Sequence, residues 1–304
     1  MELRVLQYFL AVAREQSISA AAESLHLSQP TLSTQLKAME EELGKQLLIR
    51  GTKGSRRVTL TEEGMLLRKR AEEILNLVHR TEQEIALSDE ALIAGDVFIG
   101  SGETQTVRLL ARTARCLREK YPGIHLHISS GNSIFVLEQL EKGLIEFGLL
   151  YTPVDPARYE SVEIPCRDPW GVLMRKDTPL AEKPFIRPED LWDKPLIFSV
   201  QEDAGSALSR WIKRDREKLN IVATYNLLYN ASLLVEEGLG YSLCFAGLIN
   251  TEGNSPLCFR PLEPKLESTA FLAWKKYQVF SKAAEKFIQK LQEVLAKEMP
   301  PCRQ

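Results

Sequence analysis

Hydrophobic positions at the start of the chain recur at helical spacing and predict three short helices. The first is marked by apolar residues three or four apart, namely Leu3, Leu6, Phe9, Leu10 and Ala13. A second is expected over 17–25, where Ser17 can cap the helix and three consecutive alanines allow another helix to pack closely. A third is expected from Ser28, with Pro30 in its first turn, and Gly44 ends it. The short connection between the second and third helices is typical of a helix-turn-helix.

The start of the third predicted helix carries short polar side chains that can read bases. These are Gln29, Thr31, Ser33, Thr34 and Gln35. Glutamine can pair with adenine through two hydrogen bonds, and threonine or serine can bond a base edge or touch a thymine methyl group. A capped helix whose polar face is only hydrated would show the same pattern, so the helix start alone leaves both interpretations open.

A basic segment after this helix favours the DNA-binding interpretation. From Gly44 to Arg57 there are five basic residues and no acidic one. Two glycines within 50–57 predict a turn, and this turn would place Arg50, Lys53, Arg56 and Arg57 on phosphates as a wing. The alternative is a solvated loop. Residues 61–95 hold eight acidic and four basic residues, so the basic surface is expected to be small and local.

A long helix with a heptad stripe is predicted over 61–92. The stripe consists of Leu67, Ala71, Ile74, Val78, Thr81, Ile85, Ser88 and Leu92, spaced alternately by four and three residues. The stripe can pack against its own domain or against a second subunit. About 30 helical residues span about 45 Å, which is too long for a sixty-residue domain to cover. Pairing of two subunits along this helix is therefore expected.

Beyond Gly95 short apolar runs alternate with amphipathic helices, which predicts a mostly parallel α/β sheet. In a first set we expect strands at 97–100, 124–128 and 147–150 and helices at 104–120 and 133–143. The second set has strands at 171–175, 196–200, 223–226 and 241–244, with helices through Trp211 and up to Gly238. A strand at 269–277 and a helix at 281–297 then return to the first set. The chain is thus expected to cross twice between two lobes.

Ligands of such sheets bind beyond the carboxyl ends of the strands, next to helix N-termini. Two glycine-containing turns there offer polar groups for a small effector. The candidates in the turns are Ser101, Gly102, Glu103 and Thr104 in one and Asn132 and Ser133 in the other. Ser199 and Gln201 are expected to face them across a cleft, which Asn226 and Tyr229 would close. Plain helix capping explains each turn equally well when it is taken alone.

The composition is that of an ordinary globular protein, and it narrows the classes of protein to which the chain can belong. The 304 residues include 39 Lys and Arg against 41 Asp and Glu, for a net charge of −2, with 44% hydrophobic and 26% charged residues. These values exclude collagen-like, mucin-like and disordered chains. No apolar run reaches about 20 residues. Since 1–4 show no basic stretch followed by an apolar region, we expect no signal peptide. Five scattered cysteines without a C-x-x-C pair fit reduced thiols, so we expect a cytoplasmic protein without membrane contact.

Motifs for other chemistry are incomplete. Residues 100–102 lack the third glycine of a dinucleotide fingerprint, there is no Walker A lysine motif, and 240–244 imitates a nucleophile elbow but ends in cysteine. His125 and His127 share a strand face, yet no further ligand lies near them in sequence. Cys244 and Cys258 are conceivable as a redox pair, but packed thiols are the stronger expectation. We therefore expect no catalytic site, no cofactor and no bound metal.

Several of these segments, in this order and register, resemble the LysR-type transcriptional regulators. The resemblance rests on Leu6–Ala13, Ser17–Ala22, Leu27–Ser33, Glu40–Gly44 and Leu60–Gly64. At 47–50 the chain reads Leu-Leu-Ile-Arg where the family often has Leu-Phe before the arginine, a conservative departure. The resemblance implies a winged helix-turn-helix that binds double-stranded DNA, with Gln29, Pro30, Thr31, Ser33 and Thr34 at the groove.

The C-terminal part is similar to the effector domain of the same family, which is itself like periplasmic solute-binding proteins. The similar segments are 169–173 and 238–240, and Glu146 stands where the family often has aspartate. The expected class is α/β, with an N-terminal all-α winged helix-turn-helix (1–60), a linker helix (61–92) and a two-lobed effector-binding domain (93–304). Lobe I would comprise 93–164 and 268–304, and lobe II 165–267. The resemblance also implies a homodimer through the linker helix, a homotetramer, and possible contact with RNA polymerase.

Three classes of function remain to be weighed. An enzyme with its own repressor domain would need a phosphate-cradling loop, which the sequence does not contain. A constitutive architectural DNA binder would need neither the two lobes nor their polar turns. A ligand-responsive regulator that binds inverted-repeat promoter sites, and changes DNA bending or activation when an effector binds, accounts for all three regions.

Overall fold

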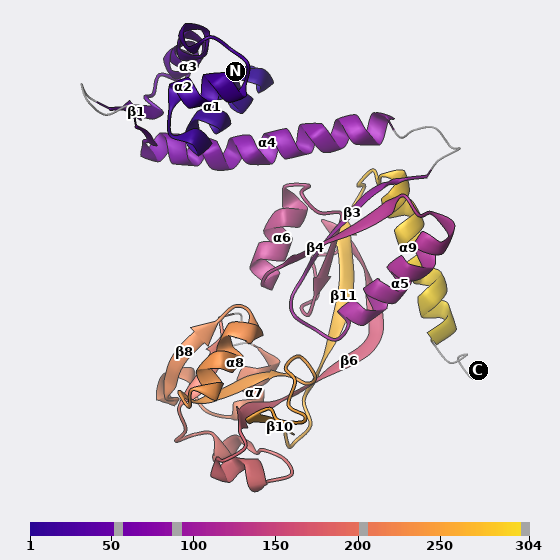
Figure 1. Ribbon diagram of the computed structural model, residues 1–304. Helices are drawn as coiled ribbons and strands as arrows, with labels where there is room; N and C mark the ends of the chain where they lie inside the picture. The colour runs from indigo at the N-terminus through magenta and orange to yellow at the C-terminus, as the bar shows by residue number, and fades with distance from the viewer. Residues whose placement is uncertain (52–56, 87–92, 201–205, 299–304) are drawn as a thin grey trace. The chain divides into compact units, whose positions relative to one another are not determined.

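A computed structural model of the chain describes residues 1–51, 57–86, 93–200 and 206–298 (Figure 1). The chain divides into two compact units, Met1–Ala86 and Leu87–Gln304. The first unit, called the head here, contains α1 (Leu3–Glu15), α2 (Ile18–Ser24), α3 (Gln29–Leu43), β1 (Leu48–Arg50), β2 (Val58–Leu60) and α4 (Glu62–Ala86). The two strands pair antiparallel, with Arg50 opposite Val58, and carry the segment expected as a wing.

Helix boundaries in the head follow the predicted caps. Ser17 caps α2 by accepting a hydrogen bond from the N–H of Ala20, and Ser28 caps α3 by accepting one from the N–H of Thr31. Gly44 ends α3 with φ of 65°, a left-handed conformation that glycine adopts without strain. The core between the helices is fully buried and includes Leu6, Phe9, Leu32 and Leu36. The predicted starts of α2 and α3 and the predicted end of α3 are confirmed.

The long helix α4 begins against the wing base. Thr61 lies just before it and accepts a hydrogen bond from the N–H of Gly64 at 3.0 Å, while its own hydroxyl donates to the carbonyl of Gln46 at 2.8 Å. A Cβ on Gly64 would lie 2.2 Å from the carbonyl oxygen of Leu47. Only glycine therefore allows α4 to approach the backbone this closely.

The two parts of the heptad stripe of α4 lie in different environments. Ala71 is fully buried in the head core, and Leu67 and Ile74 pack against that core. Farther along the helix, Ile85 is 70% exposed. The expectation that the whole stripe is free for a partner is thus wrong for its first half, because α1 and the head core cover it. Ser88 and Leu92 lie outside the described residues.

The second unit is a mixed α/β structure. Its helices are α5 (Val107–Lys120), α6 (Ser133–Glu141), α7 (Ala207–Ile212), α8 (Leu228–Glu236) and α9 (Lys282–Glu298), with short 3-10 turns η1 (Pro179–Glu182), η2 (Pro188–Asp190) and η3 (Arg216–Lys218). Its strands are β3 (Gly95–Ser101), β4 (Ile124–Ser130), β5 (Phe147–Leu150), β6 (Tyr159–Arg175), β7 (Leu196–Ser199), β8 (Ile221–Tyr225), β9 (Tyr241–Phe245), β10 (Leu257–Pro261) and β11 (Glu267–Lys275). The described strands follow the order β4-β3-β5-β11-β6-β9-β7-β8, and β10 pairs with β6.

Strand β6 belongs to two groups of strands. Its first part pairs antiparallel with β11, from Tyr159 opposite Lys275 to Pro169 opposite Glu267. Its last part pairs with β9 on one side and β10 on the other. We call the group β4-β3-β5-β11 with the first part of β6 lobe I, and the last part of β6 with β10, β9, β7 and β8 lobe II. Only 171–175 of β6 was predicted, and β10 was not predicted.

Each lobe has its own cores on the two faces of its strands. In lobe I, α5 and α9 cover one face around Phe147, and α6 covers the other around Val136 (Figure 1). In lobe II, α7 packs on one side around Phe198 and α8 on the other around Ile197. This layering places the start of each helix beyond the carboxyl end of a strand, where ligand sites of α/β sheets lie.

Candidate DNA interface and effector site

The start of α3 presents its polar side chains to solvent. Gln29, Pro30, Thr31 and Thr34 are exposed, and Ser33 is half-buried. The hydroxyls of Ser28 and Thr31 lie 2.7 Å apart, so the cap holds Thr31 in place. The Oε1 of Gln29 accepts a hydrogen bond from the hydroxyl of Ser19 on α2 at 3.3 Å. The structure thus brings together, at one exposed helix end, the five residues expected at the groove, namely Gln29, Pro30, Thr31, Ser33 and Thr34.

Glu40 on α3 anchors the first strand of the wing. Its Oε1 accepts hydrogen bonds from the N–H groups of Leu47 (2.8 Å) and Leu48 (3.0 Å). Its Oε2 lies 3.3 Å from Nη2 of Arg50, and the Glu40 side chain is only 13% exposed. Arg50 is therefore held in an ion pair at the base of the wing. Sequence reasoning missed Glu40, because nothing in its helical position signals a contact with the following strand.

The second strand of the wing is anchored by Gln16. Gln16 ends α1 in a left-handed conformation, with φ of 51°, and its carbonyl accepts the N–H of Val58 at 2.8 Å. Its side-chain oxygen accepts a hydrogen bond from Nε of Arg57 at 3.0 Å. Arg57 is exposed beside this contact. Lys53 and Arg56, also expected on phosphates, lie outside the described residues.

The two glycine-containing turns of lobe I are neighbours. Strands β3 and β4 run parallel with Ser101 opposite Ser130, and the N–H of Gly131 donates to the carbonyl of Ser101 at 3.0 Å. The Ser101 hydroxyl is buried and donates to the carbonyl of Gly102 at 2.7 Å. Asn132 caps α6 by accepting the N–H of Phe135 at 2.8 Å. Its side chain therefore has the capping role that the sequence left as an alternative, and Ser133 beside it is half-buried.

A buried polar cluster fixes the first of these turns to the strand that joins the lobes. The carboxylate of Asp168, on β6, accepts hydrogen bonds from the hydroxyls of Thr104 (2.7 Å) and Thr106 (2.8 Å) and from the hydroxyl of Tyr151. Asp168 is 3% exposed. Burial, and next the hydrogen bond to Asp168, raise the pKa of Tyr151 far above its usual value near 10. Asp168, Thr106 and Tyr151 were missed, because Tyr151 and Thr106 are 17 and 62 residues away from Asp168 in sequence.

The lobe II candidates also gather at one edge. Strands β7 and β8 run parallel with Ser199 opposite Tyr225, so Ser199 and the following Asn226 lie at neighbouring strand ends. Ser199 is half-buried, Asn226 is exposed and Tyr229 is 64% exposed. Glu103 of lobe I reaches this edge, where its carboxylate accepts the N–H of Leu228. Gln201 lies outside the described residues.

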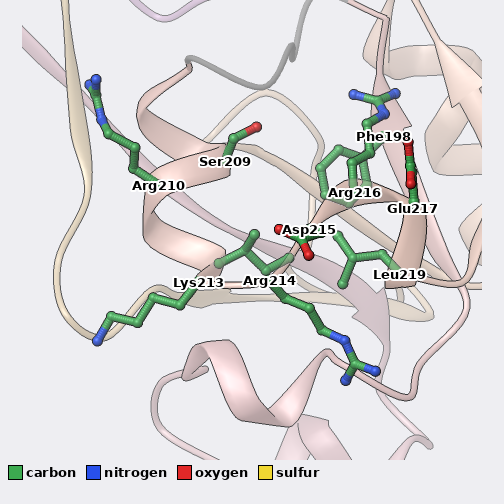
Figure 2. Close-up of a pocket in the computed structure, with 10 residues that line it drawn as sticks. Phe198, Ser209, Arg210, Lys213, Arg214, Asp215, Arg216, Glu217 and Leu219 are labelled. Carbon is green, nitrogen blue, oxygen red and sulfur yellow. The ribbon is translucent and has the colours of Figure 1, made fainter.

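A separate pocket of about 540 Å³ lies on lobe II beside α7 and η3 (Figure 2). Four cationic side chains surround it, and their charged ends point away from one another: Arg210, Lys213, Arg214 and Arg216. Asp215 lies in the middle and pairs with Lys218 at 2.6 Å. Since the charges do not converge and none of the predicted effector residues that the structure describes lines it, we do not assign the effector to this pocket.

The geometry of the cysteines does not allow the considered redox pair. Burial raises the pKa of Cys244 to about 12 and also raises the pKa of Cys258. Cys244 is on β9 and Cys258 on β10, and β6 lies between these strands. Two strand spacings amount to about 10 Å, whereas a disulfide joins Cα atoms about 4.4–6.8 Å apart.

His125 and His127 both lie near Asp96. Nε2 of His127 is 2.9 Å and Nδ1 of His125 3.7 Å from the Asp96 carboxylate. In the described ranges of the chain, no group of three or more His, Cys, Asp or Glu side chains is arranged to hold a metal ion. None of the helices in those ranges is long and apolar enough to cross a membrane.

The winged helix-turn-helix with its exposed helix start, followed by a two-lobed α/β unit, defines a DNA-binding transcriptional regulator with an attached effector-binding domain. Comparison with known families agrees. Residues 3–65 match the bacterial regulatory helix-turn-helix proteins of the lysR family, and residues 90–296 match the LysR substrate binding domain. The chain therefore belongs to the LysR family of transcriptional regulators.

Known relatives match from about two thirds to nearly all of the chain. The Hca operon transcriptional activator HcaR of Escherichia coli (strain K12) is 31% identical over 303 residues, which cover 97% of this chain and 99% of HcaR. The hydrogen peroxide-inducible genes activator of Pectobacterium carotovorum subsp. carotovorum is 30% identical over 199 residues, 65% of this chain and 64% of that protein. Full-length CbnR, solved in complex with its target DNA, has the same fold, with a TM-score of 0.73 at 21% identity, covering 97% of this chain and 100% of CbnR.

Proposed function

We propose that this regulator binds inverted-repeat promoter sites as an oligomer and changes DNA bending or activation when a small-molecule effector binds between its lobes. The observation that carries the proposal is the capped, exposed start of α3 in a head whose wing strands are anchored by Gln16 and Glu40. We assign the protein no enzymatic reaction and no cofactor. Its place of action is the cytoplasm, where it would also meet RNA polymerase.

DNA contacts divide into two kinds. Gln29, Pro30, Thr31, Ser33 and Thr34 enter the major groove and read bases, because their side chains lie together at one exposed helix end. Arg50, Lys53, Arg56 and Arg57 contact phosphates and set the register of the head without reading sequence. Gln16 and Glu40 support the second kind of contact, since they fix the two strands that carry the wing arginines.

Oligomerisation is proposed to proceed through α4 and then through the second units. The exposed end of the α4 stripe, at Ile85, supports a homodimer, and a two-fold pair of heads fits an inverted repeat. A homotetramer needs a further surface. Exposed apolar side chains in the second unit supply candidates for it, namely Ile128, Ile134, Tyr229 and Leu233.

The effector site is proposed where the turns of lobe I meet the strand ends of lobe II. It comprises Ser101, Gly102, Glu103, Thr104, Asn132 and Ser133 from one lobe and Ser199, Gln201, Asn226 and Tyr229 from the other. The contact of Glu103 with Leu228 supports this assignment, because it brings the two sets together. We keep the proposed division into 1–60, 61–92 and 93–304. Within the last part we had expected lobe I at 93–164 and 268–304 and lobe II at 165–267, but β6 pairs with β11 through Pro169, so we place the boundary in β6 between Pro169 and Trp170.

A thiol-based response to peroxide is the second candidate, since one relative is a hydrogen peroxide-inducible genes activator. The separation of Cys244 and Cys258 by a strand, and the raised pKa of both thiols, count against that pair as the sensor. A bound small molecule is therefore the favoured signal.

The effector proposal is tested by a thermal-shift screen of metabolites on the full chain, because a ligand bound only by the native state raises its apparent stability. A hit is then followed by DNase footprinting with the wild type and with Ser133→Ala and Ser199→Ala. Both variants should fold and bind DNA but lose the effector-dependent change in footprint. A full response of both at unchanged effector concentration would place the site elsewhere.

A further inference from the structure

The turn at 101–106 holds lobe II by two side chains. The carboxylate of Glu103 accepts the N–H of Leu228, the first residue of α8, and Nε2 of Gln105 donates to the carbonyl of Gly247 after β9. Gln105 is itself held by Arg108, whose Nε donates to the Gln105 side-chain oxygen. These contacts join residues 125 and 142 positions apart.

Helix α8 depends on lobe I for its cap. Its own N-cap residue is Leu227, whose side chain has no group that can accept a hydrogen bond. The first N–H groups of a helix have no partner within the helix, and a negative charge near them is favourable. A carboxylate supplied by the other lobe therefore takes the place that serine or aspartate usually has in the helix itself.

The second contact is fitted to a glycine. Gly247 has φ of 74°, and a Cβ there would lie 3.4 Å from Cγ and Nε2 of Gln105. The Gln105 side chain thus lies directly on the Gly247 backbone, with no side chain of lobe II between them.

The same turn is tied to the strand that connects the lobes. Thr104 and Thr106, on either side of Gln105, both donate to the buried carboxylate of Asp168. Asp168 lies two residues before Trp170, where the part of β6 that belongs to lobe II begins. The turn is therefore fixed at its base, and a rotation of lobe II about this strand would separate Glu103 from α8 and Gln105 from Gly247 together.

We propose that Glu103 and Gln105 form an interlobe latch that stabilises the arrangement of the two lobes described here against rotation. Breaking the latch costs free energy. A ligand that binds another arrangement of the lobes more tightly must supply at least this free energy through its difference in affinity. Only this consequence for the effector response rests on the proposed function; the latch itself rests on the two contacts. Glu103 then acts as a positioning residue, and its replacement weakens the contact at Gly247 as well as the one at α8.

Hydrogen exchange followed by mass spectrometry on the full chain tests the latch. Peptides are followed at three places, namely the start of α8, the turn at 245–249 and the turn at 101–106. Glu103→Ala should speed exchange about tenfold at all three, because the contacts fail together when the lobes part. Gln105→Ala should give the same pattern. Glu138→Ala is the matched control, since Glu138 lies in lobe I and pairs with Lys142 of its own helix.

A double variant separates the latch from a local cap. In Glu103→Ala with Leu227→Asp, α8 has a cap of its own, so its start should regain protection while the turn at 245–249 stays fast. Faster exchange confined to the start of α8 in Glu103→Ala, and abolished by Leu227→Asp, would overturn the latch. Exchange in the head peptides should stay unchanged throughout, and DNA binding by the head is a separate readout, so failure of the latch and failure of the proposed function give different results.

Discussion

Replacing Ile85 by aspartate is expected to separate the subunits of the regulator. Ile85 is 70% exposed in the single chain, and full burial of an isoleucine side chain is worth up to about 3 kcal/mol. Pairing along α4 would therefore gain about 2 kcal/mol per subunit, or about 4 kcal/mol for a two-fold pair. Without this gain of about 4 kcal/mol the dissociation constant rises about a thousandfold, since about 1.4 kcal/mol corresponds to a factor of ten. The desolvated carboxylate of the introduced aspartate weakens pairing further.

Sedimentation velocity over a range of concentrations measures this change. Ile74, on the same stripe, is a poor position for the test, because it packs against the head core and its replacement would damage the head. Leu66→Asp is the matched control, since Leu66 is 59% exposed but lies outside the stripe. The wild type and Leu66→Asp should sediment as the same species and Ile85→Asp as a smaller one. Equal sedimentation of Ile85→Asp and wild type would refute pairing through α4.

Four further substitutions and one labelling experiment test other parts of the structure. Gln29→Ala should cost about 1–3 kcal/mol of binding free energy on a specific site and little on random DNA, as measured by fluorescence anisotropy. Arg57→Ala should weaken binding to both DNAs and reduce the salt dependence of the affinity. Equal losses for Gln29→Ala on both DNAs would contradict base reading. Gly64→Ala should lower the unfolding free energy of the head by about 1–3 kcal/mol in calorimetry, because its Cβ would lie 2.2 Å from a backbone carbonyl, and an unchanged transition would show that the helix start can shift freely. Cys244 should resist alkylation at pH 8 in the native protein and react in guanidinium, since a pKa of about 12 leaves about one thiolate in ten thousand; native labelling at the unfolded rate would contradict its burial. Ser242→Ala should raise the unfolding free energy by about 1 kcal/mol in urea titration, because the buried Ser242 hydroxyl has no hydrogen-bond partner among the residues that the structure describes. A loss of stability would show that it has one.

Local chemistry made much of the head predictable. Ser17, Ser28 and Gly44 set helix limits through interactions within a few residues, and the structure has these limits where the sequence placed them. Helical and strand periodicity also located most elements of the second unit. The first part of β6 was missed, because 159–170 contains four acidic or basic residues that alternate irregularly with apolar ones and a proline at 165.

Long-range contacts explain what periodicity could not predict. The sequence offered Glu103 and Thr104 as effector ligands, but it did not reveal that Glu103 meets Leu228 or that Thr104 meets Asp168. The stripe of α4 was read as one surface, and its first half is covered because α1 folds back on it. In each case the partner is set by how distant elements pack, and no spacing within one segment records it.

Selection from a randomised pool of double-stranded DNA tests the central claim most directly. The full chain is incubated with the pool, and bound fragments are amplified and sequenced over several rounds. We expect enrichment of fragments with two inverted copies of one half-site, separated by a multiple of the helical repeat. For Gln29→Ala we expect a changed preference at a half-site base. No enrichment over the input pool, or a single unrepeated site, would contradict it.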